Sequence, residues 1–136
     1  MGLDTSHDCW HGPYSAFMRW RCEIAKTAGF PPLQLMDGFC KVPKEVPLWV
    51  GMPSEYVMLE RYLPIPWSYF FGDPLSILLH HSDCDGEIRW QDCRRIADRL
   101  RDILPDITDP AVKDRTEQFI EGLNNAHDAE ENVIFH

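Results

Sequence analysis

Residues 90–110 read WQDCRRIADRLRDILPDITDP, and this stretch decides the fold that the sequence predicts. Apolar residues recur every three or four positions from about Trp90 to Leu104, which is typical of a helix with one buried face. Pro105 ends this helix. Asp109 followed by Pro110 signals a second start, because Asp caps a helix and Pro suits its first turn. The inward residues of this second helix are Val112, Thr116, Phe119, Ile120 and Leu123.

A further helix is predicted toward the N-terminus, where Gly12-Pro13 opens a helical pattern that Gly29 ends. Its inward residues are Phe17, Trp20, Ile24, Ala25 and Ala28. Its charged residues, expected to face solvent, are Arg19, Arg21, Glu23 and Lys26. Residues 30–74 hold eight of the eleven prolines, so a long regular element is excluded there, although a short helix is predicted over Ser54 to Arg61.

Strands are predicted at three places. Leu75 to Leu79 is interpreted as a short buried strand, Asn132 to Phe135 as a last strand, and Gly2 to Thr5 as an edge that can pair with the same sheet. The predicted fold class is α+β, with about three helices packed on a small sheet, and residues 1–136 are expected to form a single domain.

The aromatic residues just before this segment leave two alternatives open. They are Trp67, Tyr69, Phe70 and Phe71. They can fold back on the core, or they can form a patch that binds a partner, since exposed aromatic side chains mark interfaces.

The stretch HSDCDGEI, residues 81–88, has the frame of an EF-hand calcium loop placed between a strand and a helix. The template puts His81 at position 1, Asp83 at position 3 and Asp85 at position 5. Gly86 then falls at position 6, where a sharp turn is needed. Glu87 supplies the backbone carbonyl at position 7.

Two positions of this template depart from a calcium loop. His81 replaces an aspartate, and imidazole nitrogen suits zinc or another transition metal better than calcium. Asp92, at position 12, replaces the longer bidentate glutamate. Three interpretations stay open: an altered divalent-metal loop, with calcium as the first candidate ion; an acidic turn without metal that keeps the shape by internal hydrogen bonds; and a softer-metal site around His81.

A second, weaker set of metal ligands is His7, His11 and His136. If both chain ends flank the predicted central strand, these side chains and His81 can converge at one edge of the sheet. We find no Ser-His-Asp or Cys-His signature and no phosphate-binding glycine loop, so the sequence leans away from an enzyme without excluding one.

Composition and charge narrow the class of protein. The chain has 136 residues, 44% hydrophobic residues and a net charge of −9. Such an acidic surface disfavours direct nucleic acid binding. The five cysteines show no paired spacing, which argues against a disulfide framework or a four-cysteine zinc site. We see no signal peptide or membrane-length apolar run and expect a cytoplasmic protein.

A resemblance to other proteins is carried by four stretches: MGLDTSHDCWHGPYSAF, LLHHSDCDGEI, FIEGL and the closing FH. Through them the chain resembles an uncharacterised family of small proteins encoded by phages and prophages. The resemblance covers most of the chain, is weakest in the proline-rich part, and is most specific at HSDCDGEI. It supplies no activity. It implies an accessory protein that acts in the cytoplasm of a host bacterial cell.

Three functions compete at this point. The first is a module that binds a host or phage protein, with the EF-like loop as a structural element. The second is a metal-dependent enzyme with a His/Asp site. The third is a phage inhibitor of a host defence system, comparable to an anti-CRISPR protein, whose acidic face would dock on a basic channel.

Overall fold

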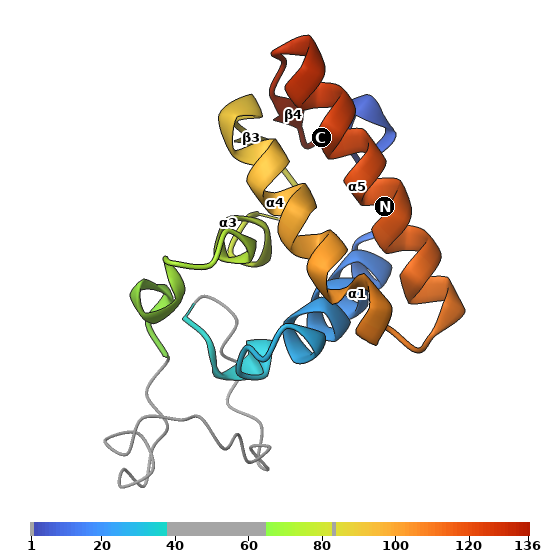
Figure 1. Cartoon of the computed structure of the whole chain (residues 1–136). Coiled ribbons are helices and arrows are strands. Elements are labelled where there is room, and N and C mark those ends of the chain that lie inside the picture. Colours follow the sequence, from blue (N-terminus) through green and yellow to red (C-terminus); the bar gives the residue numbers. More distant parts are fainter. Residues whose placement is uncertain (1, 38–64, 83) are drawn as a thin grey trace, which may run out of the picture.

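The computed structural model describes residues 2–37, 65–82 and 84–136. This part of the chain contains helices α1 (Tyr14–Thr27), α3 (Leu75–Leu79), α4 (Trp90–Ile103) and α5 (Pro110–Ala129), together with four short strands (Figure 1). The architecture is therefore a mixture of helix and antiparallel sheet, as predicted. The predicted helix over Ser54 to Arg61 lies outside the described residues, as do Cys40 and Asp83.

The two helices predicted from residues 90–110 are confirmed as α4 and α5, and they form an antiparallel hairpin (Figure 1). Asp109 caps α5 by accepting a hydrogen bond from the backbone N–H of Ala111 at 2.9 Å. A 3-10 turn, Leu104–Asp106, follows α4 at the predicted stop. The buried residues that the two helices place between them include Ile96, Ala97, Leu100, Phe119 and Leu123.

Helix α1 packs against this hairpin through the predicted apolar face. Trp20 stacks on Phe119 of α5, with ring centroids 4.8 Å apart, and its indole N–H donates to the hydroxyl of Thr116 at 3.0 Å. The prediction that Arg21 faces solvent is wrong, because this side chain is only 2% exposed. Its guanidinium donates to the backbone carbonyls of Leu79 and His81, at 3.3 and 2.6 Å, and so fastens the end of α3 to α1.

The strand predicted at Leu75 to Leu79 is also wrong: this segment is helix α3. Asp73 and Pro74 start it, and a carboxylate oxygen of Asp73 accepts from the backbone N–H of Leu75 at 3.0 Å. A buried apolar run of five residues is too short to show whether its period is that of a strand or a helix. The element that enters the loop at residue 81 is therefore a helix.

The strands form two small sheets in place of the single predicted sheet. Strand β1 (Gly2–Asp4) pairs with β2 (His11–Pro13), and β3 (Glu87–Ile88) pairs with β4 (Val133–Ile134). A bridge between Thr5 and Phe135 connects them. Asp4 and His136 also exchange two backbone hydrogen bonds, of 3.0 and 2.9 Å. The chain ends thus pair directly with each other, whereas the prediction placed them as edges of a sheet around Leu75–Leu79, which is helix α3.

The aromatic cluster before α3 is divided between the two predicted alternatives. Trp67 is buried and Phe70 packs on Phe30, with ring centroids 5.0 Å apart. Tyr69 and Phe71 are 54% and 68% exposed.

Among the described helices, none has both the length and the apolar composition needed to span a membrane.

Candidate functional site

The loop that follows α3 is closed by its histidine. One ring nitrogen of His81 lies 2.8 Å from the carbonyl oxygen of Ser82, and the other lies 3.0 Å from the carbonyl oxygen of Glu87. The same ring packs on Phe135, with ring centroids 4.2 Å apart. Gly86 has a φ of +89°, which glycine adopts without strain. A Cβ at this position would also lie 3.3 Å from the His81 imidazole, so both backbone and space favour glycine.

This geometry favours one of the three interpretations of the loop. In an EF-hand, the residue at position 1 and the carbonyl at position 7 both bind the ion. Here the imidazole of His81 contacts the carbonyl of Glu87 directly, so a hydrogen bond stands where the template places an ion. This contact is the kind that the interpretation as an acidic turn requires, and the two metal interpretations stay predictions.

The remaining predicted ligands of this loop are arranged differently. Asp92, in the first turn of α4, pairs with the guanidinium groups of Arg89 and Arg95 at 3.3 and 3.0 Å. Asp85 is exposed, and Asp83 lies outside the described residues. Over residues 2–37, 65–82 and 84–136, no three His, Cys, Asp or Glu side chains are grouped to hold an ion. Metal binding at this loop stays a prediction.

The second predicted ligand set lies at the N-terminal hook, which we define as residues 4–11. His11 stands between two carboxylates, with its ring nitrogens 2.8 Å from Asp4 and 2.9 Å from Asp8. These hydrogen bonds, that to Asp4 first, raise the pKa of His11 above its ordinary value. His136 is paired with Asp4 through its backbone. The chain ends meet each other rather than flanking a strand at Leu75–Leu79, and each imidazole of the hook has its own partner.

The hook is strained and fastened to both ends of the molecule. His7 and Asp8 have φ angles of 61° and 55°, a region that residues other than glycine rarely adopt. The ring of His7 lies 2.9 Å from the Ser6 hydroxyl and 3.2 Å from a carboxylate oxygen of Glu131. This Ser-His-Glu chain could not be predicted because Glu131 lies 124 residues from His7. The Ser6 oxygen accepts the backbone N–H of Ile134 at 2.8 Å, so the chain anchors the hook to β4.

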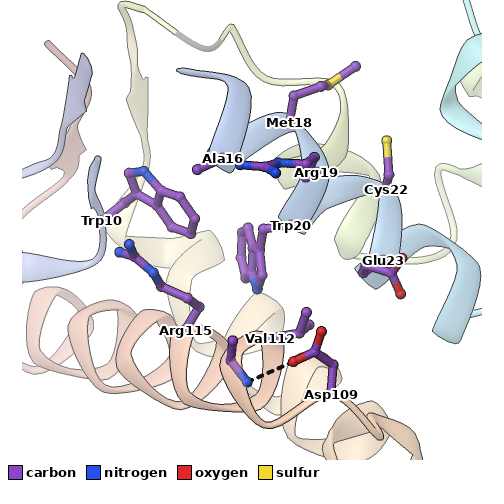
Figure 2. Close-up of a pocket in the computed structure, with 11 residues that line it drawn as sticks. Trp10, Ala16, Met18, Arg19, Trp20, Cys22, Glu23, Asp109, Val112 and Arg115 are labelled. Carbon is purple, nitrogen blue, oxygen red and sulfur yellow. Dashed lines mark hydrogen bonds between the residues drawn. The ribbon is translucent and has the colours of Figure 1, made fainter. Parts of the chain in front are cut away.

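A groove lies beside the hook, between α1 and the start of α5, and has a volume of about 710 Å³ (Figure 2). Trp10 and Trp20 lie at its base, with ring centroids 5.4 Å apart. Both rings are almost entirely buried, which makes the base rigid and aromatic. The other residues that line it are Ala16, Met18, Arg19, Cys22, Glu23, Asp109, Ala111, Val112 and Arg115.

Opposite charges lie at the two ends of this groove. Figure 2 shows Arg115 beside Trp10 at one end, with Glu23 and Asp109 at the other. The guanidinium of Arg115 lies 4.5 Å from the Trp10 ring centroid and donates to the carbonyl of His11 at 3.0 Å. Arg19 is exposed on α1 with its guanidinium toward the Trp10 end.

The sequence did not predict the groove, although part of the signal was present. Ala16, Arg19, Trp20 and Glu23 are three or four positions apart and so share one side of α1. Trp20 was predicted to be a packing residue and the two charged residues to be solvent-facing, and both predictions are confirmed. What could not be predicted is that the hook brings Trp10 against the same side of α1.

Comparison of the chain with protein-family models, with curated proteins and with solved structures found no match in any of the three.

Proposed function

We propose that this protein is a binding module that takes a segment of another protein into the groove between α1 and α5. The observation that carries the proposal is the aromatic base of Trp10 and Trp20 under a rim of separated charges. Protein-binding sites combine aromatic centres, which the partner covers, with polar rims. Trp10 and Trp20 are only 1% and 3% exposed in the free chain, so they form a fixed floor and the partner contacts mainly the other residues of the lining. The resemblance to phage-encoded proteins suggests a setting, namely a host or phage protein inside the bacterial cell.

The chemistry of the lining supports binding over catalysis. Cys22 contributes a thiol to the wall, and burial raises its pKa, so that it is protonated and a weak nucleophile at neutral pH. Both positive and negative side chains line the groove, which suits a segment of protein. The net charge of the whole chain is −9, which disfavours a phosphate backbone as the ligand.

The first experiment compares one substitution at two ends of the same helix. Ala111→Arg places a long side chain at the groove, and Ala129→Arg places it at the exposed last residue of α5. Tagged wild type and both variants would be used to capture partners from a lysate of the bacterial host, with divalent metal present and with chelator. We expect one stoichiometric partner with wild type and Ala129→Arg, and its loss with Ala111→Arg.

Two results would contradict the proposal. One is a partner that Ala111→Arg captures as well as wild type does, because the binding face would then lie elsewhere. The other is recovery of no stoichiometric partner under either metal condition. Circular dichroism melts of both variants would show that each is folded. Capture that weakens steeply with salt would instead favour an acidic face docking on a basic channel.

A further inference from the structure

We infer that the segment bound in the groove presents an apolar anchor between a carboxylate and a cation on one face of a short helix. The inference rests on the proposed function and specifies the chemistry of the partner. Two features of the groove carry it: rim charges that are free to pair with an incoming segment, and a spacing that matches one turn of helix.

The first feature concerns Arg19 and Glu23. They lie four residues apart on α1, so their side chains are neighbours on one side of the helix. Both are exposed, and within the described part of the chain neither forms an ion pair. A cation placed N-terminal to an anion is the weaker order for such a helix pair. Both charges therefore remain available to groups of opposite sign on a partner.

The second feature is the distance between the charges along the groove. Residues four apart on α1 are separated by about 6 Å along the helix axis, and Asp109 and Arg115 on α5 by about 9 Å. The same order is seen on both walls, since the guanidinium of Arg115 lies at the Trp10 end and Asp109 at the Glu23 end (Figure 2). A partner helix with opposite charges at positions i and i+4 spans about 6 Å and matches this rim.

The base of the groove specifies the residue between those charges. A volume of about 710 Å³ lies within the range of pockets that hold a bound ligand, and here it accommodates one large apolar side chain and its neighbours. The Trp20 indole N–H is already bonded to Thr116, whereas the buried Trp10 indole N–H has no hydrogen-bond partner among the described residues. The faces of both rings are nevertheless apolar. Leucine, phenylalanine or methionine is the anchor that this base fits.

The test uses three synthetic helical peptides of about 15 residues, long enough for some helix to form in isolation. All carry the same leucine and phenylalanine anchor. The flanking i and i+4 positions are Glu and Lys in the first, two Glu in the second, and two Lys in the third. Binding would be followed by the NMR shifts of the indole N–H groups of Trp10 and Trp20 in the full-length protein, a measurement that detects weak complexes.

Wild type is expected to bind the Glu/Lys peptide about five-fold more tightly than either of the others, the effect of one or two exposed ion pairs. Glu23→Lys makes the rim basic and should shift the preference to the two-Glu peptide. Arg19→Glu makes it acidic and should shift the preference to the two-Lys peptide. Two exposed control positions outside the groove, varied as Glu117→Lys and Arg101→Glu, should leave the wild-type ranking unchanged.

Equal affinity for all three peptides, or the same ranking in every variant, would overturn the inference. So would the absence of binding by any peptide at millimolar concentration. Neither result decides the proposed function, which depends on whether Ala111→Arg loses the partner captured from lysate. Indole shifts that rank the peptides as expected, with both reversals, would support the inference.

Discussion

The hook rests so closely on α5 that Gly122 cannot carry a side chain without a displacement. A Cβ at this position would lie 2.5 Å from the Cys9 sulfur, 2.8 Å from the His7 carbonyl oxygen and 2.9 Å from the Cys9 Cα. Ordinary contacts begin at 3.4 Å, so Gly122→Ala requires the hook to retreat by about 0.5 to 0.9 Å. Two of the three contacts are with backbone, which cannot turn aside as a long side chain can.

Two opposing effects set the size of the change. Alanine in place of glycine inside a helix gains about 1 kcal/mol of stability. Overpacking costs about 1–3 kcal/mol, and a retreat of the hook also stretches bonds such as that from Gln118 to the Asp8 carbonyl, at 3.0 Å, each with a net value of about 1 kcal/mol. We expect Gly122→Ala to lower the free energy of unfolding by about 1–3 kcal/mol, and Tm by about 3 to 9 °C.

The assay is urea denaturation of Gly122→Ala beside Asn125→Ala, an exposed position on the same helix where alanine should stabilise by a few tenths of a kcal/mol, roughly the propensity difference. The double variant Cys9→Ala/Gly122→Ala removes the shortest contact and should recover part of the loss, although Cys9→Ala itself leaves a small cavity. A Gly122→Ala protein as stable as wild type would refute the reasoning, because the helix propensity gain would then be unopposed.

Four further outcomes are expected. The two carboxylates raise the pKa of His11, so the extra stability of wild type over His11→Gln should be present below about pH 6.5 and lost as pH rises through the raised pKa, as denaturation at pH 6 and pH 8.5 would show. Cys84 is exposed whereas burial raises the pKa of Cys93 to about 11, so mass mapping after brief treatment with a thiol reagent should find label on the first and none on the second. Arg21→Met should cost about 1.5–3 kcal/mol in urea denaturation, since two carbonyls lose a charged donor, and an unchanged midpoint would contradict this. Calcium at millimolar concentration should leave the Tm of wild type unchanged, and a calcium-dependent rise in Tm would favour the metal loop. His81→Ala should lower the free energy of unfolding by about 1–3 kcal/mol, because carbonyl groups of the loop lose their imidazole partner.

The helices that could be predicted are those whose signals are local. The long apolar period predicts α4 and α5 from neighbouring residues alone, and the Asp109 cap adds a start signal for α5. Leu75 to Leu79 has no such length, and its helical start depends on Asp73 and Pro74, a pair of the same type as Asp109 and Pro110. The same capping signal is present at both places, but only the one at Asp109 is followed by a long apolar period.

The groove could not be predicted because its two walls come from separate parts of the fold. Trp10 reaches it through the hook, whose fastening to Glu131 and Ile134 involves residues more than 120 positions away. Arg21 was misplaced for a related reason, since the carbonyls that it binds belong to a segment 58 and 60 residues further along. A single sequence shows the period of a helix but not which partner covers each side of it.

The fastening of the hook also has a consequence for the order of folding. The α4–α5 hairpin joins residues that are near in sequence, so its contacts can form early and at small entropic cost. The hook closes a loop of more than 120 residues and gains its contacts only when α5 and β4 are in place. We therefore expect substitutions in the hook to leave the refolding rate almost unchanged and to speed unfolding, so that the N-terminal residues determine how long the folded molecule lasts rather than how quickly it forms.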